Sequence, residues 1–294
     1  IWCQKMERIL RKCQIRNRLV RECLAECLGV YILILFGCGS VAQVTTTQNQ
    51  KGQYLSINLG FALGVTFGVY VSRGVSGAHL NPAVSLSLCA LGRHSWVKLP
   101  FYVFFQFLGA FLGAATVALQ YYEAIRWYSG GELTVSGPTA TAGIFCTFPA
   151  EYLSVWAGFV DQVIGTAALL LCILALGDMG QGSIPTGIQP ILVGAVVMVI
   201  GVSMGSNSGY ALNPARDLGP RLLIYFIGWG EDVFKAGGGW WWVPVLAPCV
   251  GALLGTLVYE IMIEVHHDRN LKAASSCEVV SEGRSTLEME EPDQ

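Results

Sequence analysis

The chain has 294 residues, of which 53% are hydrophobic and only 13% are charged, and its mean hydropathy is +0.52. A soluble domain carries about a quarter charged residues, so this composition argues against a water-soluble globule. The net charge of −2 gives no basis for a nucleic-acid partner, and the long apolar runs with 11% aromatic residues exclude a disordered chain.

Six apolar stretches follow a basic leader. A helix needs about 20 apolar residues to cross the hydrocarbon core of a bilayer. Buried helices of a soluble protein are seldom this long and uncharged six times over, so we predict an all-α, multi-pass membrane protein. The first stretch is too long for the apolar region of a signal peptide, and we interpret it as a retained span. The predicted spans are 24–44, 54–71, 99–119, 156–176, 188–204 and 243–265.

The distribution of positive charge predicts the orientation. Seven Lys and Arg residues precede position 24, whereas the first connection after that span carries only Lys51. Basic residues favour the cytosolic side, so both termini should be cytosolic. We expect residues 1–23 to be a cytosolic basic segment, residues 24–267 to be the transmembrane domain, and residues 268–294 to be a disordered cytosolic tail. The plasma membrane is the expected location.

Two connections between spans have an unusual composition. Each contains a moderately apolar segment of about ten residues after a turn, at 81–90 and at 213–223. Ten helical residues rise about 15 Å, which is half a bilayer. Irregular backbone at that depth is tolerated only where it is buried or lines a wet cavity. These segments are therefore predicted to enter the membrane and return, around a pore.

The two halves of the chain match each other. The sequence SGAHLNPA at 76–83 aligns with SGYALNPA at 208–215, an offset of 132 residues. Repeat 1 spans about 24–121 and repeat 2 about 156–265. Each repeat holds three spans, an odd number, so the second copy must insert upside down relative to the first. The two short helices should then enter from opposite faces and meet near the midplane.

Each short segment begins with asparagine and proline, at Asn81-Pro82 and Asn213-Pro214. Asparagine is a preferred N-cap and proline a preferred first helical residue. A helix N-terminus carries about half a positive charge, and each asparagine amide offers N–H donors. Two facing N-termini would admit neutral hydroxylic solutes and repel cations and protons.

Over roughly residues 20–265 the sequence resembles the aquaporin or major intrinsic protein family. The resemblance rests on both Asn-Pro-Ala motifs, on the lead-in Ser-Gly-Ala-His and on Ala-Glu-Cys-Leu-Gly in the first span. Asp217 after Arg216 and the long loop 120–155 are similar to the aquaglyceroporin branch. The resemblance implies six transmembrane helices plus two re-entrant half-helices in an inverted repeat. It implies a passive channel for water, glycerol and other small neutral solutes such as urea, in a lipid bilayer, as a homotetramer without metal or cofactor.

The resemblance also implies the roles of individual residues. Glycine at 201, where water-selective members have histidine, leaves a wider opening. Aromatic walls opposite an arginine suit a polyol, whose C–H face lies on the rings while its hydroxyls accept hydrogen bonds. The implied selectivity filter is Phe61, Gly201, Tyr210 and Arg216, the asparagine motifs are Asn81, Pro82, Ala83, Asn213, Pro214 and Ala215, the pore carbonyl track is Gly77, Ala78, His79, Gly209 and Tyr210, and the structural supports are Glu26, Gln162 and Asp217.

Two of these roles have alternatives, and the spacing of four glycines adds a packing prediction. Arg216 could instead form a buried ion pair with Asp217 or Glu231. Gln162 stands where family members often have glutamate, and the neighbouring Asp161 should point about 100° away on a helix, which leaves the second support in doubt. The paired glycines Gly109/Gly113 and Gly251/Gly255 predict close packing, which we assign to contact between the third and sixth spans.

Three other classes of function can be compared with a channel. The sequence has no phosphate loop, no nucleophile with a base and no metal cluster, so an enzyme is not expected. An alternating-access carrier also uses inverted repeats and broken helices, and is the nearest rival mechanism. A membrane scaffold that kept the fold and lost conduction is the third alternative.

Overall fold

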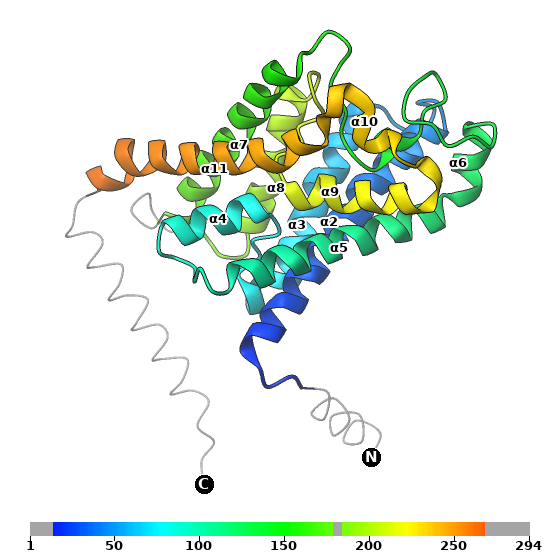
Figure 1. Cartoon of the computed structure of the whole chain (residues 1–294). Coiled ribbons are helices and arrows are strands. Elements are labelled where there is room, and N and C mark those ends of the chain that lie inside the picture. Colours follow the sequence, from blue (N-terminus) through cyan, green and yellow to red (C-terminus); the bar gives the residue numbers. More distant parts are fainter. Residues whose placement is uncertain (1–13, 179–183, 268–294) are drawn as a thin grey trace, which may run out of the picture.

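The computed structural model describes residues 14–178 and 184–267, and in these residues the chain is built from helices (Figure 1). The predicted tail, 268–294, and most of the predicted basic leader lie outside the described residues. The six predicted spans correspond to α2 (Arg18–Thr46), α3 (Tyr54–Ser76), α5 (Leu99–Gln120), α7 (Val155–Gly177), α8 (Gln189–Met204) and α11 (Val243–Met262).

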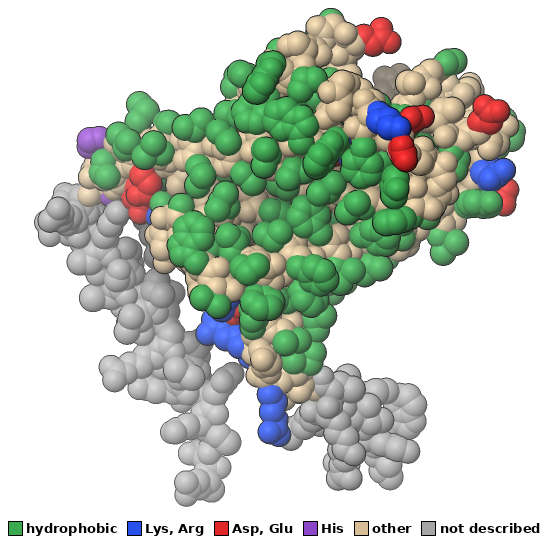
Figure 2. Space-filling model, viewed as in Figure 1, with side chains coloured by type: hydrophobic (Ala, Val, Ile, Leu, Met, Phe, Trp, Pro, Cys, Tyr) green, Lys and Arg blue, Asp and Glu red, His purple; other side chains and the backbone are tan. Residues whose placement is uncertain are grey.

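Five helical segments of the described chain are long and apolar enough to cross a membrane, and α8, with 16 residues, is a shorter apolar helix. Large apolar side chains are exposed along the outer faces of these helices; for example, Leu55 is 60% exposed and Phe104 is 62% exposed. Apolar side chains cover the middle of the visible face, while charged ones lie toward its edges (Figure 2). Such a surface suits lipid as the surrounding solvent.

The first helix begins earlier than the sequence suggested. Asn17 caps α2, because its side chain accepts a hydrogen bond from the backbone N–H of Val20. Helix α2 therefore includes the last residues of the predicted basic leader. Glu22 is buried there and pairs with Lys98 at 2.6 Å, so this turn belongs to the packed bundle.

The two re-entrant segments are short helices, α4 (Pro82–Ala90) and α9 (Pro214–Ile224). Both begin at the proline that the sequence predicts. The shorter elements of the connections are α6 (Tyr122–Tyr128), η1 (Ala142–Ile144), the π-helical turn η3 (Tyr225–Trp229), α10 (Asp232–Gly239), η4 (Trp240–Trp242) and η5 (Glu264–His266).

The helices pack in the same way in both halves. In the first repeat α2 packs against α3 and α5, and in the second α7 packs against α8 and α11. The halves then exchange their short helices: α9 packs against α5, and α4 packs against α11. Helices α3 and α8 also contact each other, as do α4 and α9. In Figure 1 both short helices lie between α11 and α5.

The assignment of the paired glycines to contact between the third and sixth spans is wrong. A Cβ added to Gly109 would overlap the carbonyl oxygen of Cys27 on α2, and one added to Gly251 would overlap that of Val163 on α7. The glycines therefore let the third helix of each repeat approach the first helix of the same repeat. Small-residue spacing shows that a helix is approached closely, but it does not name the neighbour.

Candidate functional site

The two short helices begin with the same cap. The Asn81 side-chain oxygen accepts a hydrogen bond from Ala83 N at 2.8 Å. The Asn213 side-chain oxygen accepts from Ala215 N at 2.9 Å and from Arg216 N at 3.2 Å. Because each oxygen is committed to its own helix, the amide nitrogen of each asparagine faces away from that helix.

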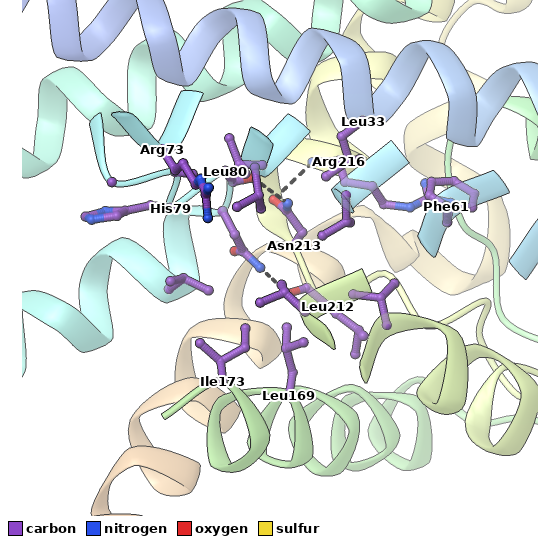
Figure 3. Close-up of a pocket in the computed structure, with 18 of the residues that line it drawn as sticks. Leu33, Phe61, Arg73, His79, Leu80, Leu169, Ile173, Leu212, Asn213 and Arg216 are labelled. Carbon is purple, nitrogen blue, oxygen red and sulfur yellow. Dashed lines mark hydrogen bonds between the residues drawn. The ribbon is translucent and has the colours of Figure 1, made fainter. Parts of the chain in front are cut away.

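The two asparagine amides tie the halves of the chain together. Asn81 Nδ2 donates to the carbonyl oxygen of Leu212 at 2.9 Å, and Asn213 Nδ2 donates to that of Leu80 at 2.8 Å. Each asparagine thus bonds the residue that precedes the other asparagine, as Figure 3 shows for Asn213. The positive N-terminal ends of α4 and α9 therefore face each other across a short distance.

The loop before α4 is held by a buried carboxylate. Glu26, on α2, is fully buried and accepts hydrogen bonds from His79 N at 2.9 Å and Leu80 N at 2.7 Å. It also accepts from Ser76 Oγ at 2.6 Å and Gln106 Nε2 at 2.8 Å. Two carboxylate oxygens thus hold the chain that leads into Asn81.

The loop before α9 is held by two neighbouring side chains of α7. Gln162 Oε1 accepts from Leu212 N at 3.0 Å, and Gln162 Nε2 donates to Ser208 Oγ at 2.6 Å. Asp161 accepts from Ser208 Oγ at 2.5 Å and from Asn207 Nδ2 at 2.8 Å. Asp161 and Gln162 leave α7 in different directions. Both side chains still reach the loop before α9, because this loop passes over both positions. In the second repeat, therefore, the Gln162 amide and the Asp161 carboxylate together hold the loop before α9, as the Glu26 carboxylate holds the loop before α4.

The backbone of both loops adopts the left-handed region at matching positions. Ala78 (φ 56°) and Leu80 (φ 54°) correspond in the repeat to Tyr210 (φ 39°) and Leu212 (φ 55°). Residues other than glycine rarely adopt the left-handed region. The backbone strain of this conformation persists only where the surrounding structure holds it in place. The hydrogen bonds to Glu26, Gln162 and the two asparagines supply that constraint.

A cavity of about 210 Å³ runs along these loops (Figure 3). Asn81 and Asn213 line its middle, Phe61 and Arg216 lie at one end, and His79 lies at the other. The predicted residues that line it are Phe61, Gly77, Ala78, His79, Asn81, Tyr210, Asn213 and Arg216. The other predicted residues do not border this cavity: they are Glu26, Pro82, Ala83, Gln162, Gly201, Gly209, Pro214, Ala215 and Asp217.

One end of the cavity combines a cation with two aromatic rings. The guanidinium carbon of Arg216 lies 4.7 Å from the centre of the Phe61 ring, and the Phe61 and Tyr210 rings meet edge to face with centres 6.2 Å apart. Arg216 Nη1 donates to the carbonyl oxygen of Phe145 at 3.3 Å. The remaining guanidinium donors can serve a solute, while the rings offer an apolar wall.

Gly201 lies beside this end without lining it. A Cβ at position 201 would lie 2.9 Å from Tyr210 Cζ and 2.6 Å from Asn58 Oδ1. The space that glycine leaves is therefore used by the Tyr210 ring and by Asn58, a residue that the sequence did not single out. Gly201 thus lies against Tyr210, which lines the cavity.

Asp217 does not pair with Arg216. Its carboxylate bonds Arg221 at 2.8 Å and accepts hydrogen bonds from Thr147 N at 2.7 Å and Thr147 Oγ1 at 2.6 Å. Within the described ranges, no carboxylate lies in ion-pair distance of Arg216, so the ion-pair alternative for Arg216 is wrong. Arg221 was missed by sequence reasoning, although its position four residues after Asp217 places both on one face of a helix.

At the opposite end of the cavity, His79 lies among other rings. His79 Nδ1 is 3.0 Å from Ser85 Oγ, and the ring centre lies 4.7 Å from that of His94 and 5.0 Å from that of Tyr102. His94 belongs to the connection between α4 and α5, and burial, with a further contribution from Lys98, lowers its pKa below the usual 6.5.

Two short helices that meet head to head, around a cavity inside a bundle of apolar helices, define a membrane channel of the inverted-repeat type. A family model described as "Major intrinsic protein" matches residues 14–259. The chain is 47% identical to aquaporin-10 from Homo sapiens over 292 residues, which cover 99% of this chain and 96% of that protein. It is 51% identical to aquaporin-7 from Mus musculus over 245 residues, covering 83% of this chain and 80% of that protein.

A solved structure agrees with these matches. The X-ray structure of the aquaglyceroporin from Plasmodium falciparum superposes with a TM-score of 0.76 and 34% identity, over 84% of this chain and 98% of that one. The chain belongs to the major intrinsic protein family, a family of multi-pass membrane channels and not of enzymes.

Proposed function

We propose that this protein is an aquaglyceroporin: a passive channel that conducts water and glycerol and excludes protons and ions. The observation that carries the proposal is the set of groups at one end of the cavity. Arg216 supplies hydrogen-bond donors, and Phe61 and Tyr210 supply apolar walls. A polyol has one face of C–H bonds and one of hydroxyls, so it fits a site with one apolar and one donating side.

The centre of the cavity supports the exclusion of charge. The N-termini of α4 and α9 converge there, each carrying about half a positive charge. The asparagine amides are also N–H donors. A cation would meet repulsion without compensating carboxylates, and a water molecule that accepts hydrogen bonds at this point is poorly placed to relay a proton.

The roles of the remaining predicted residues follow from their contacts. Gly77, Ala78, His79 and Tyr210 line the cavity, and their loop backbone supplies the carbonyl acceptors that replace hydration of the solute; Gly209 precedes Tyr210 in the same loop. Glu26, Gln162 and Asp217 hold the loops. Urea, which is small, neutral and planar, is a further proposed solute.

We also propose the setting of the channel: the plasma membrane, with both termini cytosolic, as a homotetramer with one pore in each subunit. The basic residues before the first span support the orientation. The many exposed apolar side chains on the outer faces of α2 and α3 offer surface for both lipid and neighbouring subunits.

Stopped-flow light scattering on proteoliposomes tests the function. Glycerol and water fluxes should both exceed those of protein-free vesicles. Water flux with glycerol flux at the lipid background would overturn the glycerol assignment, and both at background would favour a non-conducting scaffold. Saturable flux that runs uphill under an ion gradient would favour a carrier.

A further inference from the structure

A group of buried polar atoms lies behind the aromatic pair of the filter. Asn58, on α3, precedes Phe61 by three residues and is only 1% exposed. Neither its amide oxygen nor its amide nitrogen has a hydrogen-bond partner in the described part of the chain. The Tyr210 hydroxyl is also buried, and it too has no partner there.

These atoms surround one point. The position that a Cβ would take at Gly201 lies 2.6 Å from Asn58 Oδ1 and 2.9 Å from Tyr210 Cζ, the carbon that carries the hydroxyl. Asn58 Oδ1 and Tyr210 Cζ cannot be further apart than these two distances combined. The Tyr210 hydroxyl oxygen is one covalent bond beyond Cζ. Its missing partner and those of Asn58 therefore lie in one neighbourhood, where a water molecule that contacts polar atoms at about 2.8 Å can serve both.

The energetics require such a partner. An amide or hydroxyl buried without a hydrogen bond is strongly disfavoured, and nearly all buried polar groups are satisfied by protein or by ordered water. A buried water typically bonds two to four polar atoms that would otherwise be unsatisfied. The amide oxygen and nitrogen of Asn58 and the hydroxyl of Tyr210 form a set of this kind.

We propose that Asn58 is a positioning residue of the filter, and that it holds the Tyr210 hydroxyl through a buried water molecule beside Gly201. This bridge fixes the Tyr210 ring against Phe61, and the ring position sets the cross-section available to a polyol. The proposal rests on the proposed glycerol channel and adds a determinant to it. Gly201 belongs to the same unit, because any side chain there would enter the space between Asn58 and Tyr210.

The geometry of α3 supports this arrangement. Tyr54, Asn58 and Phe61 are spaced i, i+4 and i+7, so they lie on one face of the helix. Gly201 on the neighbouring helix α8, and Gly205 directly after that helix, are both closely approached by that face of α3 and by Tyr210. The Phe61 and Tyr210 rings thus border the cavity, and the Asn58 amide lies on the side of Tyr210 that faces Gly201.

The test measures selectivity rather than flux alone. Proteoliposomes carry the wild type, Asn58→Leu, Tyr210→Phe or the double variant, and glycerol flux is compared with that of erythritol, a polyol one carbon longer. Leu59→Ala is the control, because Leu59 is the next residue on α3 and is 44% exposed on its outer side. Losing one net hydrogen bond corresponds to a change of about three- to tenfold, so each single variant should lower the glycerol-to-erythritol ratio by about that factor.

The double variant should change the ratio no more than either single variant, because both remove the same bridge. Equal ratios in Asn58→Leu and wild type, or effects that multiply in the double variant, would overturn the proposal. Tyr210→Phe removes one oxygen atom only, so it keeps the proposal testable if Asn58→Leu does not fold. A wild type without glycerol flux would overturn the proposed function instead, and the two failures are therefore distinguishable.

Discussion

Asp217 and Arg221 form a fully buried ion pair on α9, with 2.8 Å between Asp217 Oδ1 and Arg221 Nη2. Arg221 also donates to the carbonyl oxygen of Thr147 at 2.6 Å and to that of Val233 at 2.6 Å. The pair thus fixes the segment around Thr147, and two residues earlier Phe145 accepts the hydrogen bond from Arg216. A structural ion pair therefore fixes the segment that contacts Arg216, the arginine of the proposed filter.

Asp217→Ala should strongly destabilise the protein. Removing one partner of a buried ion pair leaves an uncompensated charge, which costs roughly 3–5 kcal/mol. The unfolding temperature of the purified protein in detergent measures this loss. The control is Glu231→Ala, because Glu231 and Lys235 have the same i,i+4 spacing but are both exposed. Similar shifts in the two variants would contradict the structural role of the buried pair.

Asn213→Asp should open the channel to protons and cations. The carboxylate can still cap α9, but it loses the N–H donor to Leu80 and adds a negative charge where the two positive helix ends face each other. Proton flux, followed with a pH-sensitive dye inside proteoliposomes, should rise above background while glycerol flux persists. Asn213→Ser keeps a neutral cap and serves as the control, and it should leak less than the aspartate variant. Equal proton leak in both would argue against an electrostatic barrier.

Gly201→His should reduce glycerol flux more than water flux. The imidazole cannot occupy the space already filled by Tyr210 and Asn58, so the Tyr210 ring must move into the opening. Stopped-flow measurements with glycerol and with an impermeant osmolyte separate the two fluxes. Gly74→His on α3 is the control, since an added Cβ there has no neighbour within 4 Å among the described residues. If both fluxes fall equally, the variant has misfolded or the filter assignment is incorrect.

Gly109→Ala should lower stability. Its methyl group would overlap the backbone of α2 at Cys27, and backbone cannot move aside as a flexible side chain can. Overpacking of this kind costs about 1–3 kcal/mol. Gly39→Ala is the matched control, because in the described structure no atom lies within 4 Å of the added Cβ. The yield and unfolding temperature of the two variants are compared, and indistinguishable values would contradict the close contact of α2 and α5.

Much of the fold could be predicted because its signals are local. The start of α4 at Pro82 and of α9 at Pro214 follows from capping chemistry that involves adjacent residues. The inverted arrangement follows from an odd number of spans in each repeat. Contacts between elements that are distant in sequence were harder to predict. The glycine pairs indicate that another helix approaches closely, but the packing of the whole bundle decides whether α2 or α11 approaches α5.

The candidate site likewise combines residues that local sequence signals predict with residues whose roles depend on tertiary packing. Spacing from Asn81 and Asn213 predicts Phe61 and Arg216 as site residues. The ion-pair alternative paired Arg216 with Asp217 or Glu231, whereas Asp217 pairs with Arg221, one helical turn away. The roles of Asn58 and of Asp161 could not be read from sequence, because they depend on which loop or ring packs over them. Motif spacing predicted residues that the structure brings to one cavity, whereas tertiary packing decides which residues support them.

The most direct test records glycerol and proton flux in the same proteoliposomes, under an imposed pH gradient. The account predicts glycerol uptake well above that of protein-free vesicles, with the pH gradient decaying at the protein-free rate. Glycerol uptake at the protein-free rate, or a pH gradient that collapses as glycerol enters, would contradict a neutral-solute channel guarded by the meeting ends of α4 and α9.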